Sequence, residues 1–132
     1  MLAMPGIVCI SISAFTTYEN AQIEINELDD LLKPETAALK DLPLLVLSDD
    51  ASFTAQNISS FLWVTFTRSN PSYDIYGIDS FYHYKHWGCN GPLIIDARIK
   101  PHHAPAVEKD PEVEKKIEKI FNKGGSLYGL LK

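Results

Sequence analysis

Two short runs of uninterrupted hydrophobic residues constrain the fold of this 132-residue chain more than any other feature. One run covers Pro43 to Ser48 and ends at Asp49-Asp50, and the other covers Leu93 to Ile95 and ends at Asp96. Runs of this length, without polar alternation, are typical of central strands that are buried on both faces of a sheet. Because such strands alternate here with amphipathic segments, the sequence predicts a layered α/β fold.

The segments around these runs predict further strands. Ile7 to Ser13 places its hydrophobic residues on one face, as a strand does, and Gln22 to Asn26 alternates more cleanly, which predicts a half-exposed strand near a sheet edge. Tyr73 to Ile78 is expected to be extended. Because the two N-terminal strands are half polar, we expect a mixed, mostly parallel sheet in one domain covering residues 1–132.

Hydrophobic residues at helical spacing predict two helices. The first begins near Ser52 or Thr54, either of which can cap it, and its expected buried face comprises Ala55, Ile58, Phe61, Leu62, Thr65 and Phe66. The second begins at Asp110-Pro111, with the aspartate as its cap, and its expected buried stripe comprises Val113, Ile117, Ile120 and Phe121. Pro34 interrupts any single helix between Asn26 and Lys40.

Charge and cysteine content narrow the functional classes. Twelve Lys and Arg residues against 17 Asp and Glu give a net charge of −5, which argues against general binding to nucleic acids or to anionic membranes. No hydrophobic stretch approaches the roughly 20 residues needed to cross a bilayer, and no secretory signal is visible. Cys9 and Cys89 are too few for a disulfide framework, so we expect free thiols in the cytoplasm.

Three stretches of the sequence, together with the segment near its start, contain a specific series of motifs. The first is the strand and paired aspartates of Pro43 to Asp50. The second is Leu62-Trp63, followed by Thr67-Arg68-Ser69-Asn70-Pro71 and Asp74. The third is Leu93-Ile94-Ile95-Asp96-Ala97, then Lys100, then Lys109-Asp110-Pro111-Glu112-Val113. In this order, the three stretches resemble the C-terminal domain of the UbiD decarboxylase family, and Met4-Pro5-Gly6-Ile7 is similar to the Leu-Pro-Gly-Ile with which that domain often begins.

The resemblance implies a three-layer α/β/α sandwich and a place in the reversible decarboxylation of aromatic or α,β-unsaturated carboxylic acids. In the family, prenylated FMN with manganese and potassium lies in a preceding domain of several hundred residues, to which nothing in this chain corresponds. The resemblance therefore implies a C-terminal domain or subunit that assembles the enzyme and closes its active site, without catalysis of its own. A homo-oligomer, with a dimer favoured, or a cofactor-binding partner is expected.

Two other functional hypotheses stay open. One is a stand-alone binding or regulatory module of a multi-subunit carboxylase. The other is a small enzyme that uses Asp49, Asp50, Asp96 and Lys100 around a metal. The chain also departs from the family pattern, because Arg98 stands where family members often have Thr, and because the segment before Pro43 is short. The departures leave the substrate-facing surface open and point toward small phenolic acids.

Each polar residue of the motifs has a structural interpretation beside the functional one. Asp49 and Asp50 follow a central strand, where metal ligands can lie, but neighbouring residues of an extended chain point apart, so we interpret them as a turn residue and a helix cap. Arg68 can bind a carboxylate, but it can also bond the last carbonyls of its helix or pair with Asp74. Asp96 and Lys100 are interpreted as a structural ion pair or a loop anchor.

The aromatic residues and histidines allow a binding surface. Six aromatic residues lie between Tyr73 and Trp87, and either core packing or an interface formed by Tyr76, Phe81 and Trp87 explains them. Trp63 has the same two interpretations. His83, His86 and Cys89 recur every third residue, a spacing that would suit zinc on a helix, but Gly88 and Gly91 disfavour a helix, so we expect a solvated aromatic loop.

Overall fold

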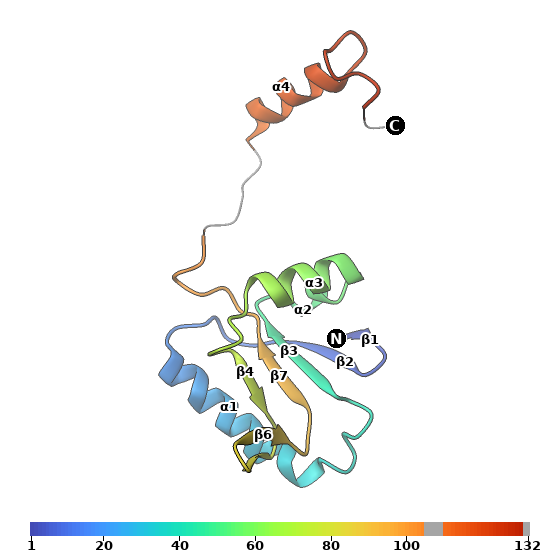
Figure 1. Cartoon of the computed structure of the whole chain (residues 1–132). Helices are drawn as coiled ribbons and strands as arrows, with labels where there is room; N and C mark the ends of the chain where they lie inside the picture. The colour runs from blue at the N-terminus through green and yellow to red at the C-terminus, as the bar shows by residue number, and fades with distance from the viewer. Residues whose placement is uncertain (105–109, 131–132) are drawn as a thin grey trace.

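A computed structural model describes residues 1–104 and 110–130 of the chain. Its centre is a five-stranded sheet in the order β1-β2-β3-β7-β4 (Figure 1). The strands are β1 (Leu2–Met4), β2 (Ile7–Ser11), β3 (Leu44–Ser48), β7 (Leu93–Asp96) and β4 (Ile75–Gly77). The two uninterrupted hydrophobic runs therefore form the neighbouring strands β3 and β7 near the middle of the sheet, as the sequence predicts.

Strands β2, β3 and β7 are parallel and stand in register, and both edge strands are antiparallel to their neighbours. Val8 lies opposite Leu45, which in turn lies opposite Ile94. The structure thus confirms an α/β fold with a mixed sheet whose central strands are parallel. Because the three central strands run the same way, their carboxyl ends meet at one edge of the sheet, where Ser48 and Asp96 lie.

Helix α1 (Tyr18–Leu32) packs against one face of the sheet. The predicted strand over residues 22–26 is wrong, because this segment lies inside α1. The Thr17 side chain accepts a hydrogen bond from the backbone N–H of Asn20 and caps the helix, and Ala21 and Ile25 are buried one turn apart. A short 3₁₀ helix over Lys33–Glu35 follows, as expected from the interruption at Pro34.

Two helices cover the opposite face, where the hydrophobic spacing predicts one. They are α2 (Ala51–Thr54) and α3 (Ile58–Thr67), and their caps are Asp50 and Asn57 rather than Ser52 or Thr54. Each cap side chain accepts a hydrogen bond from the backbone N–H of the residue three positions later, so a new helix begins after Asp50 and again after Asn57.

The face that α3 buries also differs from the prediction. Phe61 and Val64 pack on Cys9 and Val46 of the sheet, whereas Ile58, Leu62 and Phe66 are exposed. The buried and exposed residues lie on opposite sides of one helix, so the exposed ones form a separate hydrophobic surface.

The aromatic segment forms a hairpin of β5 (Ser80–His83) and β6 (His86–Cys89). Tyr84 and Lys85 make its two-residue turn, both with positive φ, as a tight hairpin with the twist of its strands requires. His83 and His86 face each other across the turn. The expected loop is thus a hairpin. Among the residues that the structure describes, no group of three or more His, Cys, Asp or Glu side chains is placed to hold a metal ion.

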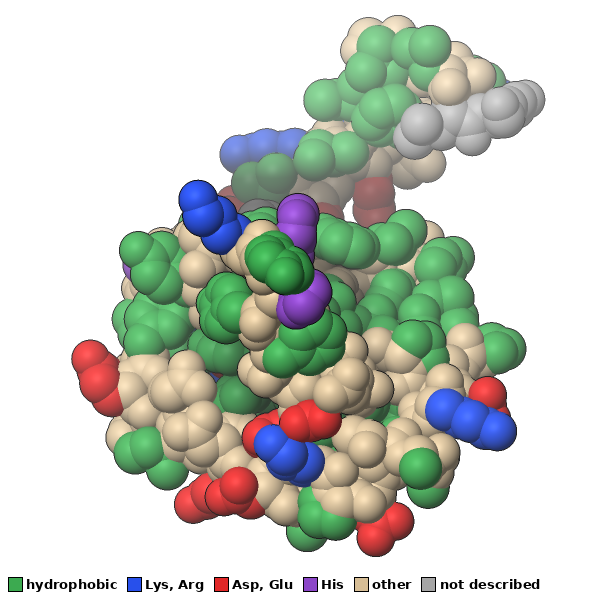
Figure 2. All heavy atoms as spheres, turned by 60° about the horizontal axis from the view of Figure 1, so that its bottom comes forward, with side chains coloured by type: hydrophobic (Ala, Val, Ile, Leu, Met, Phe, Trp, Pro, Cys, Tyr) green, Lys and Arg blue, Asp and Glu red, His purple; other side chains and the backbone are tan. Residues whose placement is uncertain are grey.

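Helix α4 (Pro111–Phe121) stands away from the sheet in Figure 1. Its start at Pro111 and its Asp110 cap are as predicted, since the Asp110 side chain accepts from the N–H of Glu112. The predicted burial of its hydrophobic stripe is wrong, because no described residue of α4 is buried. Figure 2 shows hydrophobic side chains on the surface of both the body and this separate segment.

The two cysteines are free, with Cys9 buried in the core and Cys89 partly buried. Within residues 1–104 and 110–130, the helices are too short or too polar to cross a bilayer.

Candidate functional site

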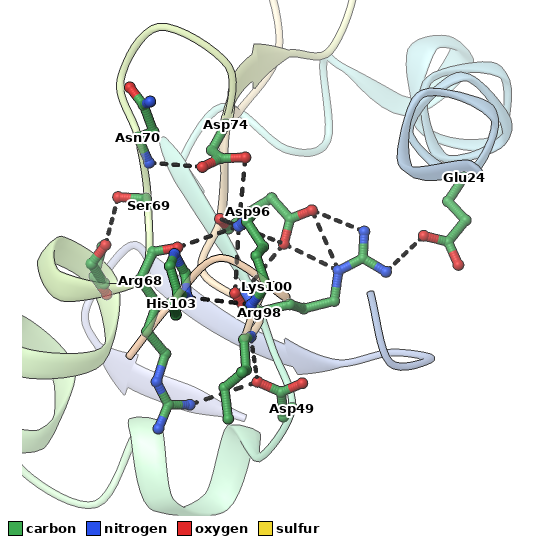
Figure 3. A network of polar contacts seen from close by, with 12 residues as sticks. Glu24, Asp49, Arg68, Ser69, Asn70, Asp74, Asp96, Arg98, Lys100 and His103 are labelled. Carbon is green, nitrogen blue, oxygen red and sulfur yellow. Dashed lines mark hydrogen bonds and ion pairs between the residues drawn. The ribbon is translucent and has the colours of Figure 1, made fainter. Parts of the chain in front are cut away.

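A cluster of charged side chains is buried at the edge of the sheet where β3 and β7 end (Figure 3). Its centre consists of Asp74, Asp96, Arg98 and Lys100, each at most 1% exposed. Asp49, Arg68 and Glu24 surround this centre and are partly exposed. We call these seven residues the Asp96 network. Carboxyl ends of parallel strands are where α/β proteins usually place ligands, so this cluster is the natural candidate site.

Arg98 makes the largest number of contacts in the network. Its Nε lies 3.0 Å from Asp96 Oδ1 and its Nη2 lies 2.7 Å from Asp96 Oδ2, so the two side chains pair through two parallel bonds. Its Nη1 donates to Glu24 of α1 at 2.6 Å and to the carbonyl of Ser13 at 3.1 Å. Burial alone would lower the pKa of Arg98, but the bonds and charges of Asp96 and Glu24 outweigh it and raise the pKa.

Lys100 places its ammonium in a shell of oxygen atoms. Its Nζ donates to the carbonyls of Asp96 at 2.8 Å, Arg68 at 3.2 Å and Arg98 at 3.3 Å. The same atom lies 3.3 Å from Asp74 Oδ1 and 3.8 Å from Asp96 Oδ1, so the ion pair between Asp96 and Lys100 is present. The ring of Phe15 covers both this ammonium and the Arg98 guanidinium, at 5.4 and 5.5 Å from its centroid.

The remaining carboxylates hold backbone groups of the surrounding loops. Asp74 accepts the N–H of Asn70 at 2.6 Å, and Asp49 accepts the N–H of Ile99 at 2.8 Å. Asp49 also lies 3.5 Å from Arg68, although the partners expected for that arginine are Asp74 or helix carbonyls. Asp74 does not pair with Arg68; its carboxylate instead contacts the Lys100 ammonium and accepts a hydrogen bond from the backbone N–H of Asn70.

The other predicted site residues lie around the network or away from it. Asp50 points away from Asp49 and caps α2, as the structural interpretation of the pair predicts. Trp63 is exposed and lies under the Arg68 guanidinium, 5.1 Å from its ring centroid. Tyr76 of β4 packs beside the α1 side of the core, where burial and the charges of Asp96 and Asp74 raise its pKa to about 12.

Phe81 and Trp87 lie on the hairpin, apart from the network. Phe81 is paired with Gly88 and Trp87 with Tyr82, so the two aromatic side chains project from opposite faces of the two-stranded ribbon. The face of the hairpin that carries Trp87 lies against β4. Gly77 of β4 is so close to it that a Cβ at this position would meet the Trp87 ring and Cys89. The interface role of Tyr76, Phe81 and Trp87 stays a prediction.

The sequence motifs point to Asp49, Arg68, Asp96 and Lys100, and the structure brings these four together. Arg98 stands out in the sequence only as a departure from a family pattern, and no motif indicates Glu24. The alternation of opposite charges at positions 96, 98 and 100 is a signal that could have revealed a buried cluster beyond β7.

The network holds loops together rather than offering a reactive group. Each of its carboxylates is bonded to a cation or to a backbone N–H, and its cations are bonded to carboxylates or carbonyls. Asp74 Oδ1 makes no hydrogen bond, but it is buried and faces the Lys100 ammonium 3.3 Å away. A general base or nucleophile needs a free lone pair directed at substrate, and a metal ligand needs one directed at the ion. The geometry therefore fits a clamp that fixes the loops at this edge of the sheet.

Comparisons with known proteins give one informative similarity. The chain is 37% identical over 84 residues to a 4-hydroxybenzoate decarboxylase subunit from Chlamydia pneumoniae, and the match covers 64% of this chain and 14% of the relative. Uncharacterized proteins of Chlamydia muridarum and Chlamydia caviae are 31% and 30% identical over 77% and 64% of the chain, and 18% and 14% of their own lengths. The similarity to the Chlamydia pneumoniae subunit supports a relationship to UbiD-like decarboxylases.

The chain spans less than one fifth of the curated relatives it matches. No protein-family model matches it. No solved structure matches it either.

Proposed function

We propose that this chain is the C-terminal assembly and active-site-closing domain, or an equivalent separate subunit, of a UbiD-like (de)carboxylase acting on aromatic or α,β-unsaturated carboxylic acids. The observation that carries the proposal is the similarity to a decarboxylase subunit over 84 residues. Since those residues make up 14% of the relative, that protein has about 600 residues and room for a separate catalytic part. The chain itself is not a catalyst.

The architecture supports an assembly role. Helix α1 packs on one face of the sheet and α3 on the other, which agrees with the three-layer sandwich expected for a UbiD C-terminal domain. The Asp96 network ties the α3–β4 loop, the β2–α1 loop and the segment after β7 into one rigid edge. A rigid edge suits a part that must present a fixed surface to a partner.

The cofactor belongs elsewhere in this proposal. Prenylated FMN with manganese and potassium needs a phosphate cradle and free acidic ligands, and the described part of this chain supplies neither. Its only adjacent glycines, Gly124-Gly125, follow a helix instead of preceding one. The described carboxylates of the network are all bonded to groups of this chain. We therefore propose that the cofactor and its metal ions lie in the rest of the enzyme or in a partner subunit.

The test is purification of the chain, through a C-terminal tag, from the cells that produce it. The proposal expects a flavin absorbance spectrum together with a polypeptide much larger than 14.8 kDa, either carrying the tag itself or co-purifying with it. A parallel purification from untagged cells controls for flavoproteins that bind the resin. A lone chain of 14.8 kDa without flavin would overturn the proposal.

A second candidate is a separate binding or regulatory module of a multi-subunit carboxylase. The relative's description as a subunit favours it. In the same purification, this candidate expects the 14.8 kDa tagged chain bound to a large flavin-containing protein that keeps its carboxylase activity after the small chain is removed. Loss of activity on removal favours the closing domain instead.

A further inference from the structure

Lys100 and His103 close a tight turn at the point where the chain leaves the sheet toward α4 (Figure 1). The backbone N–H of His103 donates to the carbonyl of Lys100 at 2.9 Å, and the backbone N–H of Lys100 donates to Nδ1 of the His103 ring at 3.1 Å. Figure 3 shows the His103 ring beside Lys100. The two residues hold each other through reciprocal bonds, as the ends of a capping box do at the same spacing of three positions.

The bond to the imidazole exists only while His103 is neutral. Nδ1 accepts the Lys100 N–H through its lone pair, so the ring proton must lie on Nε2. When the ring takes up a second proton, Nδ1 becomes a donor that faces another donor, and the bond is replaced by a repulsive contact. Histidine is the side chain whose charge ordinarily changes between about pH 5 and 8, so moderate acidification is enough to break this bond.

The surroundings of His103 oppose its protonation. Partial burial, and after it the neighbouring His102, are the largest causes that lower the pKa of His103 below its ordinary 6.5. The cations Lys100 and Arg68, the latter at the C-terminal end of α3, act in the same direction, whereas Asp74 of the α3–β4 loop opposes them. The closed turn therefore favours the neutral ring, and His103 binds a proton more tightly once the turn has opened.

We propose that the turn from Lys100 to His103 is a pH-sensitive latch, which is closed while His103 is neutral and opens when His103 takes up a proton. Opening is confined to the chain after Lys100, because the Lys100 ammonium is held separately by the carbonyls of Asp96, Arg68 and Arg98. The sheet and the Asp96 network thus stay closed at mildly acidic pH, while the segment that leads to α4 is released from the edge of the sheet.

The direction of the pH effect follows from the lowered pKa. Because the pKa of His103 is lower in the closed turn than in the open one, the closed turn has its full advantage above pH 6.5 and loses it as the pH falls through the lowered pKa. Between the two pKa values, the equilibrium shifts toward the open turn by up to about tenfold for each pH unit. His102 modulates this equilibrium without making the bond, since its ring lies 4.8 Å from the His103 ring, between centroids.

An NMR titration of the full chain between about pH 8 and 5 tests the latch. The His103 ring signals should titrate with a midpoint below 6.5, and the amide signals of Lys100 and His103 should move with the same midpoint. Protection of the Lys100 amide against hydrogen exchange, relative to an unstructured chain at the same pH, should fall over that range while the amides of β3 and β7 stay protected. A midpoint at or above 6.5, or a Lys100 protection that does not follow the charge of His103, overturns the proposal.

Two substitutions separate the latch from a general effect of acid. His103→Asn puts an amide oxygen in the place of Nδ1, which accepts the Lys100 N–H at every pH, so acidification should no longer lower the protection. His102→Asn, at the exposed neighbouring position, is the matched control: it keeps the pH-dependent loss, with a higher midpoint, because a charge that lowers the pKa of His103 is gone.

The latch is refuted if His103→Asn keeps the wild-type pH dependence or if His102→Asn abolishes it. Circular dichroism shows whether each variant is folded, and His103→Gln, whose side chain also reaches back three positions in capping boxes, replaces His103→Asn if that variant unfolds. The wild-type titration decides the proposal in either case. Neither outcome bears on the decarboxylase assignment, which co-purification of flavin tests separately.

Discussion

Replacing Lys100 by Met tests whether the Asp96 network is a structural clamp. The substitution keeps the length of the side chain and removes an ammonium that is fully buried and bonded to three carbonyls. It also leaves Asp74 without its cationic partner, 3.3 Å away. Removing one partner from a buried ion pair costs about 3–5 kcal/mol, mostly because the remaining charge stays buried and uncompensated.

We therefore expect Lys100→Met to lower the free energy of unfolding by about 3–5 kcal/mol. For a domain of this size, that loss lowers the Tm by roughly 10–20 °C. Urea unfolding, followed by circular dichroism, measures it as a shift of the midpoint with an unchanged slope. Lys40→Met, at an exposed position, is the control and should change the stability by less than about 0.5 kcal/mol.

A double-mutant cycle shows whether the ion pair itself is responsible. Asp74→Asn removes the charge that Lys100→Met leaves behind, so the double variant should be more stable than the sum of the two single effects by about 1–3 kcal/mol. A loss below about 1 kcal/mol for Lys100→Met, or strict additivity in the cycle, would refute the clamp.

Three further predictions concern neighbouring features. Arg98→Lys keeps the charge but loses the paired bonds to Asp96, so urea unfolding should show a loss of about 2–4 kcal/mol; wild-type stability would mean that the planar group is dispensable. Because the pKa of Tyr76 is raised from its ordinary 10 to about 12, stability is fully present below pH 10 and falls as the pH rises toward 12. Tyr76→Phe should flatten that fall in a pH series of urea midpoints, and an unchanged slope would contradict the assignment. Asp50→Ala should cost about 1 kcal/mol and Asp50→Asn almost nothing, since Asn also caps helices; equal losses would point to a role for the charge.

The sheet could be predicted from the sequence because its central strands are buried on both faces. Such strands appear as uninterrupted hydrophobic runs, and β3 and β7 lie where those runs are. The segment from Gln22 to Asn26 was predicted wrongly because five alternating residues fit a strand as well as part of a helix. Two features indicate the helix: the Thr17 cap, and the burial of Ala21 and Ile25 one helical turn apart. Thr17 and Ala21 lie outside the five-residue segment.

The candidate site was predictable only where its members are close in the chain. Asp96, Arg98 and Lys100 stand at alternating positions, and their pairing depends on local geometry beyond β7. Glu24 and Ser13 come from 74 and 85 residues away, so only the packing of α1 and its preceding loop on the sheet brings them to Arg98. In the same way, the helical period of α4 predicts a stripe but does not indicate which surface receives it.

The distances along the chain that the Asp96 network bridges also have a kinetic consequence. Its bonds join residues separated by 32, 50, 74 and 85 positions, so they can form only after the loops between them have closed. Contacts of this kind are absent from the rate-limiting state for folding when that state is built from local elements. Weakening them then leaves the folding rate nearly unchanged and speeds unfolding. For a domain that folds in this way, the buried charges at the end of β7 set how long the folded state persists once it has formed.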